Sequence, residues 1–165
     1  MSDSPAPTAG ERRAIAGLEA SGITFDLTRH GPVRSLEEAA EARGIDPGGI
    51  VKTIVVRRGD DDFLFVLVPG GRTISWPKLR ALLGVSRLSM PDAETAKDVT
   101  GYVRGTITPF GSLTAWPVVA DTHVVTRSVS IGGGAHGVAA TVDGADLARA
   151  LDATVADVTE PEATS

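Results

Sequence analysis

The chain has 165 residues, of which 42% are hydrophobic and 22% are charged, and it carries a formal net charge of −5 and no cysteine. This length suits a single domain with a buried core, and the lack of cysteine excludes disulfides, a thiol nucleophile and thiolate metal sites. The longest apolar runs, such as residues 63–68, are too short to cross a bilayer. Because no apolar signal-peptide segment is visible, we expect a cytoplasmic protein that does not act at a membrane.

Charged residues are distributed unevenly along the chain. Residues 51–111 hold 9 basic and 6 acidic residues, whereas the segments on either side are net acidic. A basic middle segment can form a surface for an anionic ligand, or it can arise by chance. The candidates for phosphate contacts, each of which is otherwise an ordinary solvated residue, are Arg57, Arg58, Arg72 and Arg104.

The first part of the chain predicts a helix and a strand after a flexible leader at residues 1–10. Ile15 and Leu18 follow helical spacing, which predicts a helix over residues 11–22. Alternating apolar and polar residues then predict a half-buried strand over residues 23–28, with its apolar positions inward.

The next segment predicts a helix followed by a hairpin. Ser35 and Glu38 form a capping-box pair, which predicts a helix over residues 35–44. Two apolar strands at about 51–58 and 63–71 are separated by the acidic turn "GDDD". Consecutive strands joined by a short turn indicate a β-hairpin.

Two helices with proline near the start are predicted next. The helix over residues 75–85 is expected to bury Leu79, Leu82 and Leu83, and a shorter helix is expected over residues 89–99.

The last part of the chain predicts a loop, several short strands and one helix. After the glycine-rich loop at 100–112, we expect strands around 117–120, 127–131 and 137–142, a helix with Asp143 as N-cap, a strand over 154–159 and a disordered tail at 161–165. Long crossover helices do not separate the strands regularly, so we predict an α+β fold. Its core is expected to be a mixed, largely antiparallel, barrel-like sheet with surrounding helices, formed as a single domain by residues 11–160.

Lys52 interrupts the apolar strand that begins the hairpin. It shares one face of that strand with Ile54 and Val56, and the other face is also apolar, which is typical of a central strand. Lys52 either lies at the strand edge and extends to water, or points into a cleft and binds an anionic or carbonyl oxygen. The chain has 13 arginines and only three lysines, which favours a specific role for this ammonium group.

Two glycine-rich segments are candidates for backbone contacts with a ligand. "TGYVRGTITPFGS" (residues 100–112) fits neither a Walker loop nor a dinucleotide fingerprint, so it is either a binding loop or a connection whose Phe110 fills the core. "SIGGGAHG" (residues 130–137) is either a hairpin turn or a close approach of the backbone to a ligand. Asp121 either caps a turn or holds a catalytic loop in place.

The spacing of the histidines and serines matches no metal site and no nucleophile motif. His30, His123 and His136 have no metal-ligand spacing, and no nucleophile elbow occurs. Acyl-transfer chemistry would therefore depend on positioned water, backbone donors and Lys52, and we expect no metal and no cofactor.

The order of these motifs resembles the YbaK/EbsC family, the free-standing relatives of the editing domain inserted in bacterial prolyl-tRNA synthetases. The resemblance covers roughly residues 22–158. It is carried, in order, by "RHGPVRSLEEAAEARGI", "IVKTIVV", "FLFVLVPGGRTISWPKLRALLG", "SMPDAETAKDVTGYVRGTITPFGS", "WPVVADTHV" and "VSIGGGAHGVAATVDGADLARAL".

The resemblance implies trans-editing: hydrolysis of mischarged aminoacyl-tRNA at its acceptor end, with Cys- or Ala-tRNA(Pro) as the expected substrate and prolyl-tRNA synthetase as a possible partner. A non-catalytic module that binds tRNA or a nucleotide is the alternative, and a hydrolase of small aminoacyl esters is a third interpretation. The implied catalytic residues are Lys52, Gly105, Gly111 and Asp121. The implied substrate-binding residues are His30, Thr53, Gly101, Tyr102, Thr108, Pro109, Phe110, Gly132, Gly133 and Gly134.

Overall fold

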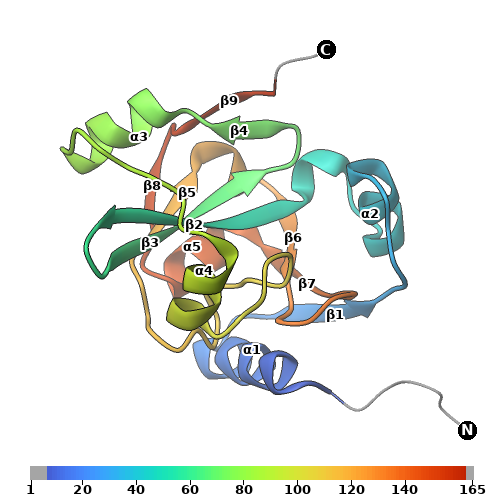
Figure 1. Cartoon of the computed structure of the whole chain (residues 1–165). Coiled ribbons are helices and arrows are strands. Elements are labelled where there is room, and N and C mark those ends of the chain that lie inside the picture. The colour runs from blue at the N-terminus through green and yellow to red at the C-terminus, as the bar shows by residue number, and fades with distance from the viewer. Residues whose placement is uncertain (1–6, 163–165) are drawn as a thin grey trace, which may run out of the picture.

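Three β-sheets surrounded by helices make up the computed structural model, which describes residues 7–162 (Figure 1). The helices are α1 (Ala9–Ser21), α2 (Leu36–Arg43), α3 (Trp76–Leu83), α4 (Ala93–Thr100) and α5 (Gly144–Ala150), with short 3-10 helices η1 (Pro47–Gly49) and η2 (Thr122–Val124). The strands are β1 (Phe25–Arg29), β2 (Val51–Gly59), β3 (Asp62–Pro69), β4 (Arg72–Ile74), β5 (Val118–Asp121), β6 (Ser128–Gly132), β7 (Val138–Asp143), β8 (Thr154–Ala156) and β9 (Thr159–Pro161).

The sheets have mixed, largely antiparallel pairing, as the sequence predicts. One sheet has the order β2-β3-β5-β8, a second has β1-β7-β6, and β4 pairs with β9. The β3-β5 and β5-β8 pairs are parallel and the others are antiparallel. The α+β class is therefore confirmed. Within residues 7–162 the strands form three separate sheets and do not close into a barrel, so the barrel-like part of the prediction is not confirmed.

Strand β2 lies at the edge of its sheet, and the prediction of a central strand is wrong. It pairs with β3 on one side only. On the other side Ile50 makes an isolated bridge to Ser130, and Arg57 makes one to Ser89. The edge of β2 is thus covered at both ends and open between them, and this opening positions the site described below.

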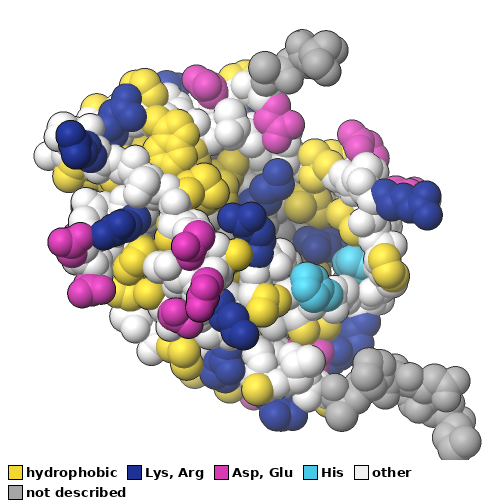
Figure 2. All heavy atoms as spheres, viewed as in Figure 1, with side chains coloured by type: hydrophobic (Ala, Val, Ile, Leu, Met, Phe, Trp, Pro, Cys, Tyr) yellow, Lys and Arg dark blue, Asp and Glu magenta, His cyan; other side chains and the backbone are white. Residues whose placement is uncertain are grey.

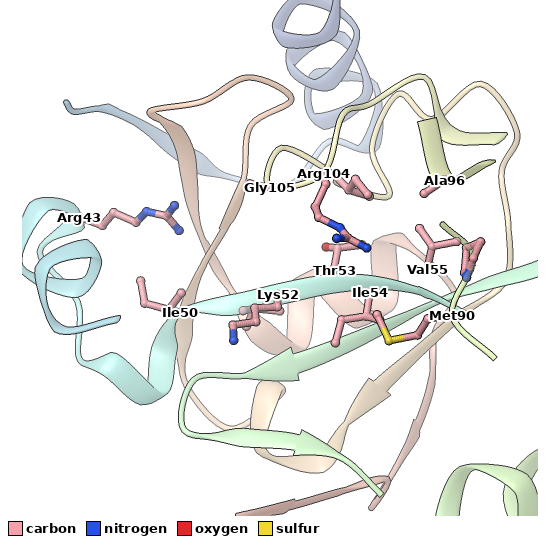
Figure 3. Close-up of a pocket in the computed structure, with 14 residues that line it drawn as sticks. Arg43, Ile50, Lys52, Thr53, Ile54, Val55, Met90, Ala96, Arg104 and Gly105 are labelled. Carbon is pink, nitrogen blue, oxygen red and sulfur yellow. The ribbon is translucent and has the colours of Figure 1, made fainter. Parts of the chain in front are cut away.

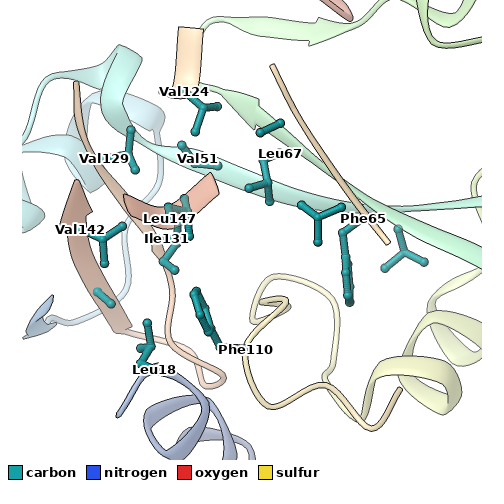
Figure 4. Packing of buried hydrophobic residues seen from close by; sticks show 14 of the residues in the cluster. Leu18, Val51, Phe65, Leu67, Phe110, Val124, Val129, Ile131, Val142 and Leu147 are labelled. Atoms are coloured by element: carbon teal, nitrogen blue, oxygen red, sulfur yellow. The ribbon is translucent and has the colours of Figure 1, made fainter. Parts of the chain in front are cut away.

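Side chains from the two faces of the β2-β3-β5 sheet enter two separate hydrophobic clusters. One face contributes Val51, Val55 and Phe65 to the larger cluster, and the other contributes residues such as Val56 and Val66 to the smaller one. This alternation explains why both faces of β2 are apolar although the strand is an edge. Figure 4 shows the larger cluster, with Phe110, Leu18 and Ile131 among its labelled residues.

Helix caps predicted from the sequence are found in the structure. Ser35 Oγ accepts from the Glu38 backbone N–H at 3.0 Å, and a carboxylate oxygen of Asp143 accepts from the Asp146 N–H at 3.1 Å. The β2–β3 hairpin is also confirmed. Helix α1 begins at Ala9, inside the expected leader, because Thr8 caps it. The disordered tail expected from residue 161 is wrong at its start, because Pro161 belongs to β9 and the Glu162 N–H donates to the Gly71 carbonyl at 3.0 Å. The rest of the leader and tail predictions falls largely on residues 1–6 and 163–165, which lie outside the described residues.

Four local predictions differ from the structure. Leu27 and Leu82, expected inward, are 38% and 39% exposed. Pro91 precedes α4, whose cap is Asp92. The strand expected over 154–159 is divided into β8 and β9, because the chain leaves β5 after Ala156 and pairs with β4 from Thr159.

The helices and side chains of the described region carry neither a membrane span nor a metal cluster. Over residues 7–162, no helix has the length and apolar character needed to cross a bilayer. The same region holds no group of three or more His, Cys, Asp or Glu side chains suited to a metal ion.

Candidate active site

A cavity of about 280 Å³ lies where the loop after α4 passes over the open edge of β2 (Figure 3). Its walls come from β2 and the residue before it, α2, α4 and the segment before it, the loop and β6. The residues that line it are Arg43, Ile50, Val51, Lys52, Thr53, Ile54, Val55, Met90, Pro91, Ala96, Arg104, Gly105, Ile107 and Gly132. The lining is mainly apolar, and within the described residues it includes no carboxylate.

The edge of β2 presents backbone groups to this cavity. Arg57 exchanges both of its backbone hydrogen bonds with Ser89, on the side away from β3. Because hydrogen-bonding direction alternates along an antiparallel strand, the N–H and C=O groups of Thr53 and Val55 also point away from β3. The Thr53 hydroxyl is buried and has no hydrogen-bond partner among residues 7–162. A polar ligand could therefore bind along this edge.

Lys52 lies at the rim of the cavity and reaches water. Its side chain is 57% exposed, and its Nζ lies 4.0 Å from Glu162 Oε1, whose side chain is 51% exposed. An exposed pair at this distance contributes little stability and does not fix the ammonium group. Lys52 therefore fits both interpretations given above. Its strand is an edge strand and its side chain extends to water, and the same residue also lines the cavity, where it can meet a ligand.

The loop of residues 101–111 brings Gly105 and Ile107 to the cavity. Gly105 has φ +89°, a left-handed conformation that favours glycine. Thr106 anchors this turn, because its N–H and its hydroxyl both donate to the Val103 carbonyl, at 3.0 and 2.7 Å. The backbone N–H groups of Gly105 and Ile107 donate to no acceptor within residues 7–162. Because both residues line the cavity, these N–H groups are candidate donors to a ligand oxygen.

Gly132 allows β6 to approach this loop closely. A Cβ placed there would lie 3.1 Å from the Ile107 carbonyl oxygen. The neighbouring glycines have other roles: a Cβ on Gly133 would meet Val138, and one on Gly134 would meet the Gly10 carbonyl oxygen in α1. Only the first of the three glycines lines the cavity.

The rest of the glycine-rich loop packs against the body of the protein. Tyr102 is 1% exposed, and its hydroxyl donates to the Phe110 carbonyl at 2.6 Å. Burial raises the pKa of this phenol. A Cβ on Gly101 or Gly111 would meet Arg13 of α1. The Arg13 guanidinium lies over the Tyr102 ring. The buried residues Thr108, Pro109 and Phe110 complete this packed portion. The structure therefore places outside the cavity lining five predicted substrate-binding residues, Gly101, Tyr102, Thr108, Pro109 and Phe110, and the predicted catalytic residue Gly111.

Asp121 is buried beneath a different part of the surface. Its carboxylate accepts from the His123 N–H at 3.0 Å, from His123 Nδ1 at 2.7 Å, from the Val158 N–H at 3.1 Å and from the Thr159 hydroxyl at 2.9 Å. Burial opposes ionisation, but these hydrogen bonds together lower the pKa of Asp121 below its ordinary value. Asp121 caps η2 and does not line the cavity.

A second cavity of about 550 Å³ adjoins the first. Its lining includes His30, His136 and Val138, and it shares Arg43 and Gly105 with the first cavity. Figure 2 shows two histidine side chains beside a hollow rimmed by basic side chains on this face. Arg43 lies at the end of a predicted helix, where an arginine is ordinarily solvated. Nothing in the nearby sequence therefore distinguishes it from an ordinary surface arginine.

Comparison with known proteins identifies the family. Residues 30–150 match the family model described as "Aminoacyl-tRNA editing domain". The chain is 38% identical over 80 residues to a proline–tRNA ligase of Thermosipho africanus, covering 48% of this chain and 14% of the ligase. It is 30% identical over 83 residues to the "Putative Cys-tRNA(Pro)/Cys-tRNA(Cys) deacylase EbsC" of Enterococcus faecalis, covering 50% of this chain and 51% of that protein.

A solved structure extends the likeness to almost the whole chain. The "Crystal structure of a putative trans-editing enzyme for prolyl tRNA synthetase" superposes with a TM-score of 0.83 and 26% sequence identity. The match covers 94% of this chain and 99% of that one. The chain belongs to the aminoacyl-tRNA editing domain family.

Proposed function

We propose that this protein is a trans-editing hydrolase that removes a wrongly attached amino acid from tRNA, most specifically from Cys- or Ala-tRNA(Pro). The proposal places the scissile ester in the cavity between the open edge of β2 and the Gly105–Ile107 turn. It is supported by family membership and by the similarity to proteins described as a deacylase and a trans-editing enzyme. On this proposal the protein acts in the cytoplasm on the tRNA acceptor end, with prolyl-tRNA synthetase as a partner.

The main support for the proposal is a pair of backbone N–H groups without acceptors among the described residues, in a cavity whose lining is mainly apolar. The Gly105 and Ile107 N–H groups are free of acceptors within the described residues, and both residues line the cavity. When water attacks an ester carbonyl, negative charge develops on the carbonyl oxygen. Fixed N–H donors stabilise this charge without reorganisation during the reaction.

Lys52 supplies the positive charge in this mechanism. Its flexible, exposed ammonium group leaves Glu162 and binds a substrate oxygen when tRNA enters. Water adds to the ester carbonyl and the tetrahedral intermediate collapses. The ribose oxygen leaves and takes up a proton, which gives the free amino acid and an uncharged tRNA. No protein nucleophile is required, because positioning of ester and water can supply much of the rate enhancement.

The cavity lining favours an uncharged, mainly apolar aminoacyl group. About 280 Å³ must accommodate the aminoacyl group close to Ile54, Ala96 and Ile107. A difference of one methylene is worth about 1–3 kcal/mol in an apolar pocket. Family membership and the similarity to a protein described as a Cys-tRNA(Pro) deacylase make cysteine or alanine the expected side chain, and hydrolysis of correctly charged Pro-tRNA(Pro) is expected to be slow.

The test is a panel of tRNA(Pro) charged with Cys, Ala, Ser, Thr or Pro. Wild type is expected to deacylate the Cys or Ala form fastest, and Lys52→Ala is expected to lose this activity while remaining folded. Lys97→Ala is the matched control, because Lys97 is exposed and outside the cavity lining. If wild type leaves the whole panel intact at high enzyme concentration, the enzymatic proposal fails.

Two outcomes would favour the other interpretations. Binding of charged tRNA without any hydrolysis would favour a non-catalytic binding module. Equal rates on tRNA and on simple aminoacyl esters would favour a hydrolase of small esters.

A further inference from the structure

Arg43 is a partly buried cation with no carboxylate partner among the described residues. Five other arginines form ion pairs with acidic side chains: Arg29, Arg57, Arg58, Arg127 and Arg149. The hydrogen bonds of the Arg43 side chain go instead to neutral groups, His30 Nε2 at 3.3 Å and Ser130 Oγ at 3.4 Å. Burial lowers the pKa of this guanidinium, as expected for a cation that is partly removed from water and has no carboxylate beside it.

His30 and Ser130 orient the guanidinium. His30 Nδ1 lies 2.8 Å from the Gly31 carbonyl oxygen, which can only accept, so Nδ1 carries the hydrogen. His30 Nε2 then accepts from the Arg43 Nε–H. Ser130 holds Nη1, whereas Nη2 has no hydrogen-bond partner within residues 7–162. Nε and Nη1 thus make long hydrogen bonds to neutral groups, and Nη2 is left for a ligand.

Arg43 stands at the junction of the two cavities. It lines both, together with Gly105. Neither lining contains an Asp or a Glu among the described residues. Figure 3 shows the Arg43 side chain reaching from α2 into the space beside Ile50. An anion that entered the second cavity would therefore meet this guanidinium immediately beside the proposed ester pocket.

We propose that Arg43, held by His30 and Ser130, is an anion-binding residue that receives the 5′-phosphate of the terminal nucleotide of the substrate. The proposal rests on the proposed function, because it takes the ester to lie in the adjoining cavity. A planar guanidinium with a free edge suits a phosphate oxygen, and a charge-assisted hydrogen bond to it forms in a partly desolvated site.

Binding measurements test this proposal independently of catalysis. Adenosine 5′-monophosphate and adenosine are each titrated into wild type, Arg43→Gln, Arg43→Lys and the control Arg127→Gln. Binding is followed by NMR of the His30 ring and by calorimetry. Wild type is expected to bind the monophosphate about tenfold or more tighter than adenosine. Arg43→Gln should abolish this preference, Arg43→Lys should reduce it, and Arg127→Gln should retain it, because Arg127 already pairs with Asp46 outside both cavities.

Two results would overturn the proposal. Equal affinity of wild type for the monophosphate and adenosine, including undetectable binding of both, would show that no phosphate site exists. Inorganic phosphate that binds as tightly as the monophosphate would show a site for free anions and not for the nucleotide.

A kinetic comparison separates this proposal from the proposed function. Aminoacyl-adenosine and its 5′-phosphorylated counterpart are offered as minimal esters. Arg43→Gln should lower kcat/KM about ten- to hundredfold for the phosphorylated ester only. If wild type hydrolyses neither these esters nor charged tRNA, the deacylase proposal fails while the binding result still decides the role of Arg43. Equal losses on both esters would contradict the phosphate assignment, and thermal unfolding shows whether each variant is folded.

Discussion

His123 Nδ1 donates to the buried carboxylate of Asp121 at 2.7 Å, and the same carboxylate accepts from the Val158 N–H and the Thr159 hydroxyl. These contacts join the end of β5 to Val158, which lies between β8 and β9, and to Thr159, the first residue of β9. An acidic residue that the family resemblance assigns to catalysis thus sits within a hydrogen-bond network away from the cavity lining. The geometry gives Asp121 a supporting position in the fold.

Acid stability is expected to depend on Asp121. Its pKa is lower in the folded protein than its ordinary value of 3.8, so the unfolded chain binds more protons between these two values. The contribution of Asp121 to stability is therefore complete above about pH 4 and is lost as the pH falls through the folded pKa. Urea unfolding between pH 2.5 and 6 should show a shallower acid loss for Asp121→Asn than for wild type, and parallel curves would contradict this.

Removal of the Glu11 carboxylate is expected to destabilise the protein. Glu11 in α1 is 3% exposed and forms a two-pronged ion pair with Arg29 of β1. The hydrogen bond from Arg29 is the largest cause of the lowered pKa of Glu11. Glu11→Ala should cost about 1–3 kcal/mol of unfolding free energy, measured in urea, because it removes charge-assisted hydrogen bonds. Glu19→Ala, at an exposed position of the same helix, should change stability by under about 0.5 kcal/mol.

A methyl group at Gly132 is expected to displace the loop of residues 101–111. The added Cβ would lie 3.1 Å from the Ile107 carbonyl oxygen, so the turn that carries the free N–H groups must shift by a few tenths of an ångström. Gly132→Ala should lower kcat for deacylation about tenfold, because donors aimed at the oxyanion tolerate little displacement. Gly59→Ala is the control, since its Cβ would make ordinary contact with Asp62 at 3.8 Å. Unchanged kcat in Gly132→Ala would argue against this loop as the oxyanion donor.

Lys52 is expected to matter for activity and not for stability. Its pairing with Glu162 is long and exposed on both sides, so Lys52→Ala should change the unfolding free energy by under about 1 kcal/mol. Lys52→Arg should not restore full deacylation, because a planar guanidinium cannot reproduce the compact contact of an ammonium group. Loss of activity together with a large loss of stability would mean that Lys52 supports the fold.

Local features of this fold can be predicted from the sequence because local residues determine them. The Ser35 and Asp143 caps and the β2–β3 hairpin each depend on a few consecutive residues. The edge position of β2 could not be predicted in this way, since it depends on which distant strands pair with β3. Apolar residues on both faces of a strand indicate two neighbouring layers, and they do not reveal a missing neighbour within the sheet.

The candidate site also contains features that can be predicted from the local sequence and features that depend on the packing of distant segments. Lys52, Thr53, Gly105 and Gly132 line the first cavity, as expected of residues within recognisable motifs. Arg43 cannot be predicted from the sequence, because only the fold brings its neutral partners His30 and Ser130 beside it. The same limit applies to Tyr102 and its neighbours, whose sequence indicates an unusual backbone path but not that α1 lies behind it.

The pairing of distant segments has a consequence for how fast the protein folds. Phe25 of β1 lies opposite Val142 of β7, and Ile74 of β4 lies opposite Thr159 of β9, so both sheets close loops of many tens of residues. Loop-closure entropy opposes such contacts before their energy is gained. We therefore expect folding on the order of milliseconds to seconds. The cavity, which needs β2, the 101–111 loop and β6 together, should form late, after most of the chain has left the ribosome.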